Sequence, residues 1–557
     1  MLLQKDPKRC AIFLFYDPQG VVDRYIIEML KDMRSDVSHI LTVVNGFVNS
    51  EGRALLEKYS DEVLLHLNVG FDVGGYRAGL FHIGFEKLME YDEFMMLNYT
   101  FFAPVYSFRE MFAEMDKRDL DFWGITRHHM VNGDPFLGKI SYGYMPNHIN
   151  SHFIAIRRSM FETEAYQKFM IELKNPESYV ESITSYEAVF TKIFEDQGFK
   201  WDVYVDSDRF EGMYFAPFMY AVSDLIEENR CPIIKRRNFF TDYLPFLQNT
   251  AGESSSALYE TLQDKTDYDT TIIWDNVLRL QNQADIHQTV HLNYFPDAAF
   301  HERDMSCDGE ISVCVFGNEA LWEALPNSYK EAIPANASLH MMGMVDETAA
   351  QLKMAGEVAG RSRFTLIINL PDMAKEQEPK SNAASLLYRE LENLCGTEAV
   401  IANILKEFDK DQSLGLMVSP VPDFGIYFAM LGDGWAGRFD KVKEALAAAE
   451  VNVPLKPSQN HPIFPMGGSF WIRSKLLAKT AQELENADKD DALLARLMLP
   501  YLLQDKRYFT GSSLSTRYAP IEMTNLDYSL RENNRMVFDK FGPDYFEIEL
   551  KRIRREV

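Results

Sequence analysis

One stretch of the sequence decides how the rest is interpreted: Leu67-Asn68-Val69-Gly70-Phe71-Asp72-Val73-Gly74-Gly75-Tyr76-Arg77-Ala78-Gly79-Leu80. It follows an apolar, strand-like run at residues 62–67 and opens a helical pattern that continues to Met89. Glycines and an arginine at a strand-to-helix turn allow backbone N–H groups to approach an anion closely. Such a turn also occurs as a plain tight connection, so it indicates a phosphate site only together with other signals.

Apolar runs and helical patterns alternate on both sides of this stretch. Residues 10–16 form a continuous apolar run, which is typical of a parallel strand buried on both faces. A helical pattern follows at residues 22–30, and further strands are expected at 39–44 and 94–97. This alternation predicts a doubly wound α/β sheet.

Polar residues follow the predicted strands, where ligands bind in sheets of this kind. A nucleotide base or ribose would lie beside Asp17 and Asn45, although turn formation alone would also explain both. The candidates for binding an activated donor at this edge are Asp17, Asn45, Asn68, Gly70, Asp72, Arg77, Asn98 and Thr100.

Two more strands, at residues 121–126 and 151–156, enclose a long loop rich in Gly, Pro, Asn and His. A loop of that length inside a compact domain is usually functional or disordered. We therefore expect it to contact an acceptor through His128 and His148. A helix near 185–197 and a strand at 201–205 complete the first unit.

A chain of 557 residues is too long for one hydrophobic core. The patterns predict an α/β domain over residues 1–217, a helical connector and linker over 218–307, and a second α/β domain over 308–557. The second half echoes the first, because 121–126 is similar to 414–419 and 151–158 to 468–475. We interpret this as a duplication of one fold.

Composition narrows the class of partners. A formal charge of −26 argues against non-specific binding to nucleic acid and to anionic membranes. Basic runs at 235–237 and 551–555 are either docking points or solvated charge runs. The five cysteines are scattered, and the sequence shows neither a signal peptide nor an apolar run of membrane-spanning length. These features predict a soluble, reduced, cytoplasmic protein without a thiolate zinc site.

The order of these signals resembles GT-A glycosyltransferases, and the motifs are more closely similar to the rhamnan synthesis F family. The similarity begins with Asn-Val-Gly-Phe-Asp and Gly-Tyr-Arg-x-Gly-Leu within residues 68–80. It covers nearly the whole chain, through the segments 91–93, 121–126, 151–154, 268–276, 291–294, 391–396 and 465–471.

This resemblance implies two GT-A-like, Rossmann-related mixed-sheet domains joined by a helical segment. It also implies an inverting rhamnosyltransferase that moves a sugar from a nucleotide-sugar donor, such as dTDP-rhamnose, to a lipid-linked glycan. Such an enzyme would work in cell-surface polysaccharide synthesis, at the inner face of the bacterial plasma membrane and peripherally associated with it.

Two departures from the family pattern are visible. GT-A enzymes place an Asp-x-Asp-like motif after the fourth strand, whereas this chain has Asn98-Tyr99-Thr100. Mg²⁺ or Mn²⁺ would want anionic oxygen ligands there, and Tyr99 replaces the expected carboxylate. In the second half, Asn369-Leu370-Pro371 replaces the His-Asp-Lys of the family, so that domain is expected to be degenerate and non-catalytic. An alternative function is a pseudo-glycosyltransferase that binds glycan or scaffolds partner enzymes.

Sugar transfer with inversion needs a base for the acceptor hydroxyl. Glu187 stands where related GT-A enzymes place it, although a glutamate in the first turn of a helix would also suit the helix dipole. Asp121 is the second catalytic candidate. Arg77 would either pair with the donor diphosphate or form a salt bridge to Asp72.

The acceptor is expected to contact the loop and the strand that follows it. Loop histidines without a recognised ligand spacing do not indicate a metal site. Trp123 is either a sugar-stacking platform or, as is more usual for a large aromatic residue, part of the core. The candidates for acceptor binding are Trp123, His128, His148 and His152.

Overall fold

The structure is a computed structural model and describes residues 6–305, 310–376, 379–427, 433–456, 462–485, 491–545, 547–549 and 552. Within these residues the chain forms two compact units, Met1–Val277 and Leu278–Val557. Cys307 and most of the basic run at 551–555 lie outside the described residues. No helix in the described part is long and apolar enough to span a membrane.

A seven-stranded mixed sheet forms the centre of unit 1. The run at 10–16 becomes the fully buried strand β1, which pairs in parallel with β2 and β4. β9 is antiparallel to both β4 and β6, so β6 and β4 point the same way. The order across the sheet is β10 (Trp201–Val203), β6 (Phe122–Gly124), β9 (Phe153–Arg157), β4 (Glu93–Asn98), β1 (Arg9–Phe15), β2 (His39–Asn45) and β3 (Glu62–His66).

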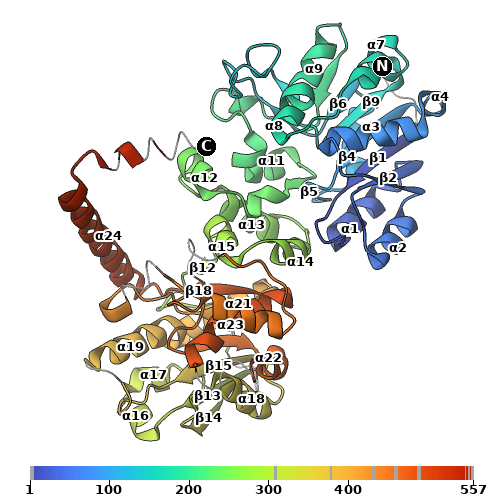
Figure 1. Cartoon of the computed structure of the whole chain (residues 1–557). Helices are drawn as coiled ribbons and strands as arrows, with labels where there is room; N and C mark the ends of the chain where they lie inside the picture. Colours follow the sequence, from blue (N-terminus) through green and yellow to red (C-terminus); the bar gives the residue numbers. More distant parts are fainter. Residues whose placement is uncertain are drawn as a thin grey trace. The chain divides into compact units, whose positions relative to one another are not determined.

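Helices cover this sheet on both faces (Figure 1). Apolar residues of α1 recur at helical spacing and are buried, whereas its charged residues face out. The principal helices before residue 200 are α1 (Arg24–Met33), α2 (Ser50–Tyr59), α3 (Phe71–Ile83), α4 (Phe85–Leu88), α5 (Phe108–Met115), α6 (Arg158–Phe161), α7 (Glu164–Glu172), α8 (Tyr179–Ser182) and α9 (Ala188–Glu195).

Two small antiparallel sheets lie beyond the main sheet of unit 1. β5 (Phe101–Phe102) pairs with β11 (Ile234–Lys235), and β7 (Arg127–His128) pairs with β8 (His148–Ile149) at the two ends of the predicted loop. The chain after residue 216 is mostly helical, as predicted. Its helices are α10 (Pro217–Tyr220), α11 (Val222–Asn229), α12 (Tyr243–Thr250), α13 (Ser254–Lys265), α14 (Thr271–Leu280) and α15 (Gln283–Val290).

A buried charge cluster holds the amino ends of β4 and β6. Glu93 is completely buried, and its carboxylate pairs with Arg9 Nε at 2.9 Å and Arg157 Nε at 3.2 Å. The indole Nε1 of Trp123 donates to the same carboxylate at 2.7 Å. Since every partner is buried and hydrogen-bonded, the cluster fixes the strand register.

Unit 2 repeats the strand order of unit 1, which confirms the predicted duplication. The strands β18, β16, β17, β15, β13 and β14 follow one another in the same order and with the same relative directions as β10, β6, β9, β4, β1 and β2. The order is β12 (Asn293–Tyr294), β18 (Phe509–Ser513), β16 (Leu414–Val418), β17 (Phe470–Arg473), β15 (Phe364–Asn369), β13 (Ile311–Phe316) and β14 (Ser338–Gly343).

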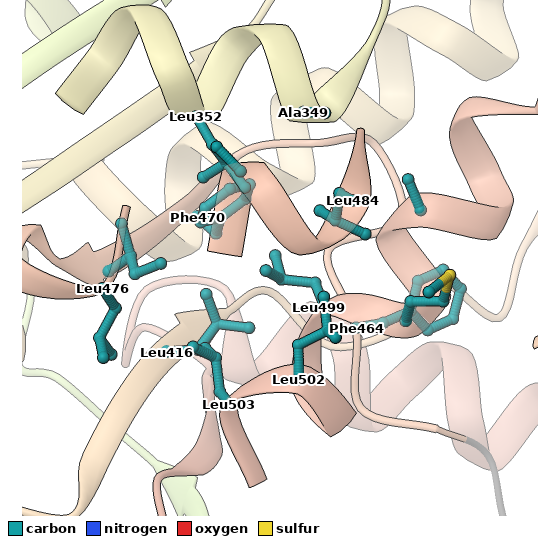
Figure 2. Close-up of a cluster of buried hydrophobic side chains, with 14 of the residues drawn as sticks. Ala349, Leu352, Leu416, Phe464, Phe470, Leu476, Leu484, Leu499, Leu502 and Leu503 are labelled. Atoms are coloured by element: carbon teal, nitrogen blue, oxygen red, sulfur yellow. The ribbon is translucent and has the colours of Figure 1, made fainter. Parts of the chain in front are cut away.

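A core of unit 2 lies between its sheet and the helices α18, α21, α22 and α23. Leu352, Leu416 and Phe470 point toward a layer of leucines that includes Leu499 and Leu502 (Figure 2). The principal helices of unit 2 after residue 300 are α16 (Glu319–Ala324), α17 (Asn327–Glu331), α18 (Thr348–Ala359), α19 (Ser381–Cys395), α20 (Glu398–Lys410), α21 (Phe439–Ala448), α22 (Leu477–Leu484), α23 (Ala492–Asp505) and α24 (Ala519–Phe541).

Candidate functional site

A group of charged and polar side chains gathers at the carboxyl ends of the parallel strands of unit 1. Asn98, the last residue of β4, donates from Nδ2 to Asp72 Oδ2 at 2.7 Å. Its Oδ1 accepts from the backbone N and the hydroxyl of Thr100 at 3.0 and 2.7 Å. Glu187 and Lys235 interact electrostatically with Asp72. We call Asp72, Asn98, Thr100, Glu187 and Lys235 the edge cluster.

Glu187 ends a π-helical turn, Ile183–Glu187, between α8 and α9. The continuous helical segment starts at Tyr179, so Glu187 is not in a first turn and the helix-dipole explanation is wrong. π-turns inside helices often occur at functional sites. The carboxylate accepts from Ser151 Oγ at 2.7 Å. This turn directs a carboxylate toward the edge of the sheet that the fold predicts for ligands.

The two carboxylates of the edge cluster differ in their electrostatic surroundings. Burial is the largest influence on the pKa of Asp72, and with the nearby charge of Glu187 it raises that pKa to about 6. Burial also acts to raise the pKa of Glu187, but Lys235, His148 and the Ser151 hydroxyl outweigh it and lower that pKa. Glu187 is therefore ionised at neutral pH, while Asp72 exchanges its proton nearer neutrality.

The histidines of the predicted acceptor loop lie together across β7 and β8. The rings of His128 and His148 stack with centroids 4.9 Å apart. Each Nδ1 lies within hydrogen-bonding distance of a carbonyl oxygen, that of His129 at 2.7 Å and that of Pro146 at 2.8 Å. Burial lowers both pKa values, that of His128 to about 4. A neutral ring that donates from Nδ1 keeps Nε2 as an acceptor for a hydroxyl group.

His152 joins this group at the start of β9. Its ring contacts those of Phe218 and Phe101, at 4.9 and 5.7 Å between centroids, and its Nε2 lies 3.4 Å from the Thr126 hydroxyl. Burial, together with the charge of Lys235, lowers its pKa well below the usual value. His128, His148 and His152 therefore lie at the same sheet edge as the edge cluster, but their role in acceptor binding stays a prediction.

Two of the predicted site residues lie elsewhere, and these predictions are corrected. Asp121 precedes β6, which runs parallel to β4, so it lies at the opposite edge of the sheet from Asn98. Its carboxylate accepts from Ser159 Oγ at 2.6 Å and from the backbone N of Lys200 at 2.9 Å. Trp123 is completely buried in the charge cluster described above, so its ring has no surface for a sugar.

The glycines of the opening stretch serve packing in this structure. A Cβ on Gly75 would lie 2.2 Å from a methyl group of Leu14, and one on Gly79 would lie 2.5 Å from Ile12. The missing side chains therefore let α3 lie close on β1. Gly70 has a φ of +81°, a conformation that favours glycine, immediately before α3. Packing and backbone conformation therefore explain these glycines without a bound anion.

The remaining donor-binding candidates have mostly structural contacts. Arg77 donates to the carbonyl oxygens of Met170 and Ile171 and to Asn175 Oδ1, and these contacts hold the end of α7. The carboxylate of Asp17 accepts from two backbone N–H groups of its own turn, as the turn explanation predicts. Asn45 Nδ2 donates to the carbonyl of Phe71, and Asn68 is exposed.

Sequence reasoning missed the cations of this site. Lys235 pairs across β11 and β5 with Phe101, and this pairing places its ammonium group near both Glu187 and Asp72. Arg237 lies near Tyr179, and the charges of both carboxylates also act on the Tyr179 hydroxyl. Arg236 is buried and bonds to Asn276 Oδ1 at 2.9 Å. The sequence feature that could have revealed these cations is the basic run at 235–237. From the sequence alone, this run was either a docking point or a solvated charge run.

A divalent cation fits the edge cluster poorly. The amide of Asn98 is already engaged on both sides, by Asp72 and by Thr100. Tyr99 contributes its backbone carbonyl to Tyr25 at 2.9 Å. Hard cations want several anionic oxygens, and the described part of the chain contains no group of three His, Cys, Asp or Glu side chains able to hold a metal.

The fold and the site together define a duplicated α/β protein with a carboxylate and cation cluster at the carboxyl ends of the parallel strands of its first sheet. The sequence model of the family described as rhamnan synthesis protein F matches residues 40–321 and 332–493. The chain therefore belongs to the rhamnan synthesis protein F family. No curated protein matches the sequence.

Solved structures show weak likeness to parts of the chain. 4-Diphosphocytidyl-2C-methyl-D-erythritol synthase from Anaerococcus prevotii is 14% identical, with a TM-score of 0.24, over 36% of this chain and 89% of its own. The mannosyltransferase Ktr4p from S. cerevisiae, in complex with GDP, is 10% identical, with a TM-score of 0.20, over 30% and 60%. Core-mannan synthase A from Aspergillus fumigatus, in a Mn/GDP form, is 11% identical, with a TM-score of 0.19, over 32% and 65%. Likeness at this level says nothing about activity.

Proposed function

We propose that unit 1 is an inverting glycosyltransferase of polysaccharide synthesis, and that it transfers rhamnose from dTDP-rhamnose to a lipid-linked glycan. The observation that carries this proposal is the edge cluster, where an ionised carboxylate and a lysine lie at the ligand-binding edge of a sheet in a rhamnan synthesis protein F chain. The protein would act in the cytoplasm, at the inner face of the membrane where such an acceptor is exposed.

Glu187 is the proposed base. Its carboxylate takes the proton of the acceptor hydroxyl while that oxygen forms a bond to the anomeric carbon of the donor sugar. The bond from that carbon to the diphosphate oxygen breaks, and its electron pair leaves with the diphosphate. Attack opposite the leaving group inverts the anomeric configuration. The neutral rings of His128 and His148 would accept hydrogen bonds from hydroxyls of the acceptor.

Lys235 and Arg237 are the proposed counterions of the leaving diphosphate. Negative charge develops on the diphosphate as the bond breaks, and a positioned cation stabilises that charge most in a site with little water. Lys235 already lies close to Asp72 and Glu187, and Arg237 lies beside Tyr179. In this proposal the two side chains supply the positive charge that a metal ion supplies in other enzymes.

Nucleotide titration tests the binding half of the proposal. Calorimetry with dTDP and UDP, with and without Mg²⁺ or Mn²⁺, should show dTDP binding that does not depend on the metal. Binding that requires the metal would contradict the counterion role of Lys235 and Arg237. No nucleotide binding at all would favour the alternative function, a non-catalytic subunit that binds glycan or scaffolds partner enzymes.

A pair of matched variants tests the catalytic half. Glu187→Gln keeps the size and the hydrogen bond from Ser151 but cannot take a proton, so transfer should be lost while dTDP affinity changes little. Asp121→Asn, at the opposite edge of the sheet, should keep turnover per folded molecule. A fully active Glu187→Gln protein would rule out its role as the base.

A further inference from the structure

A cavity of about 400 Å³ lies in unit 2 at the carboxyl end of β15. Its place in the fold matches that of the edge cluster, because β15 is the counterpart of β4, and Asn369 ends β15 as Asn98 ends β4. Pockets for small ligands usually have volumes of this order. The proposed function of unit 1 makes no use of this cavity.

The charges of the cavity argue against a nucleotide. Carboxylates outnumber cations in its lining, and the ammonium of Lys375 is shared between Asp346 at 2.8 Å and Asp372 at 3.6 Å. A diphosphate would meet net repulsion here, in contrast to the surroundings of Lys235 in unit 1. The charged residues of the lining are Asp346, Asp372, Lys375, Glu376, Glu390 and Arg496.

Glu390 is a buried acceptor built into this cavity. Only 2% of the residue is exposed, and its two carboxylate oxygens accept from the backbone N of Gly467 at 2.8 Å and of Ser469 at 3.3 Å. A Cβ on Gly467 would lie 2.5 Å from the carboxylate, so the backbone approaches closely because residue 467 is glycine. Burial raises the pKa of this carboxyl to about 7, so near neutral pH it is partly ionised, and its oxygens have further acceptor capacity, which suits ligand hydroxyl groups.

Most of the remaining lining is apolar and includes Leu386 and Leu493. A sugar ring presents C–H groups on its faces and hydroxyls around its rim, which fits a lining that is partly apolar and partly made of acceptors. A second cavity, of about 260 Å³, lies beside Ser419 at the end of β16. Since β15 and β16 are both antiparallel to β17, the two cavities lie at the same edge of the sheet.

We propose that unit 2 is a glycan-binding unit, and that the cavity at the end of β15 takes a neutral oligosaccharide segment. The acceptors and apolar surfaces recognise the sugar, and the excess of carboxylates excludes nucleoside diphosphates. Binding of a growing polysaccharide by unit 2 would keep the glycan attached to the protein between transfer steps. Only that last consequence rests on the function proposed for unit 1, because binding itself requires no catalysis.

The test uses the full chain and a purified oligosaccharide that contains only rhamnose, since this probe is neutral. Hydrogen–deuterium exchange should show saturable protection of segments 366–376 and 462–470, which carry Asn369 and Gly467. Protection confined to unit 1, or no protection, would overturn the proposal. Protection of the same segments by dTDP would show a nucleotide site instead.

Two neighbouring positions of α19 give a matched pair of variants. Leu386→Glu adds a charge to the apolar lining and should weaken oligosaccharide binding about tenfold or more. Ser385→Glu adds the same charge at an exposed position outside the lining and should bind like the wild type. Equal affinity of the two variants would refute the site. Glu390→Gln, which removes one strong acceptor, should also weaken binding about tenfold.

The transfer assay separates the two proposals. If unit 1 does not transfer sugar, oligosaccharide protection in unit 2 is still expected. If the oligosaccharide fails to protect unit 2 while transfer proceeds, only the glycan-binding proposal falls.

Discussion

We expect the charge of Asp72 to lower the stability of unit 1 at neutral pH. Its carboxyl is held at the start of α3, with Asn98 Nδ2 at 2.7 Å and the charge of Glu187 nearby. Burial and Glu187 raise its pKa from the model-compound value of 3.8 to about 6. Because the folded pKa is the higher one, the folded state favours the protonated form. The stabilisation that comes from protonating Asp72 is therefore fully present below about pH 4 and is lost as the pH rises through 6.

The magnitude follows from the size of this shift. A shift of about two pH units corresponds to about 3 kcal/mol at about 1.4 kcal/mol for each unit. Asp72→Asn keeps the size and an acceptor oxygen for Asn98 but carries no charge. We therefore expect the variant to be more stable than the wild type by up to about 3 kcal/mol at pH 7.5. The difference should shrink to about 1 kcal/mol near pH 4.5.

Thermal unfolding at several pH values measures this difference. For a unit of 277 residues, about 3 kcal/mol corresponds to a rise in Tm of about 5 °C. Asp121→Asn is the matched control, because that carboxylate accepts from Ser159 and from Lys200 N and should lose stability on substitution. If Asp72→Asn also lowers the Tm at pH 7.5, the ionised carboxylate is needed for folding and the burial argument is wrong.

Three further outcomes are expected. If Glu187 is the base, the acidic limb of the pH–rate profile for transfer should have its midpoint well below pH 6, because the pKa of Glu187 is lowered. A midpoint near pH 6 would assign the role to Asp72. Lys235→Met should weaken dTDP binding in calorimetry about tenfold or more, and unchanged affinity would remove it from the donor site. Arg157→Met should lower the free energy of unfolding in denaturant by about 3–5 kcal/mol, because it leaves the buried Glu93 with one fewer cation; a loss under about 1 kcal/mol would show that the cluster does not need it.

Buried strands were predictable from the sequence because their apolar runs are continuous. The runs at 10–16 and 311–316 correspond to β1 and β13, which are buried along their whole length. β14 and β18 were not recognised. β14 is an edge strand without a buried residue, and β18 consists of Phe-Thr-Gly-Ser-Ser, so both form through pairing with neighbours rather than through their own pattern.

The opening glycines show where a local pattern is ambiguous. A missing side chain gives space, but the sequence does not say whether a ligand or a neighbouring side chain fills it. In this protein Leu14 and Ile12 of β1 fill the space beside Gly75 and Gly79. The interpretation of the fold was right because either cause requires a strand-to-helix turn there, whereas the inference of a bound anion needed evidence from elsewhere in the chain.

Lys235 shows why the site could be predicted only in part. Glu187 and Asn98 follow from strand order and chain position, which are regular features of the fold. Lys235 reaches the same place only through the pairing of β11 with β5, between segments more than a hundred residues apart. Among the described residues of unit 2, no two-stranded sheet corresponds to the pair of β5 and β11. The same strand order therefore carries two carboxylates with Lys235 and Arg237 in unit 1, and four carboxylates with two cations in unit 2, so duplication of the fold did not preserve the charge of the site. This difference is the physical reason to assign the nucleotide to one unit and the neutral glycan to the other.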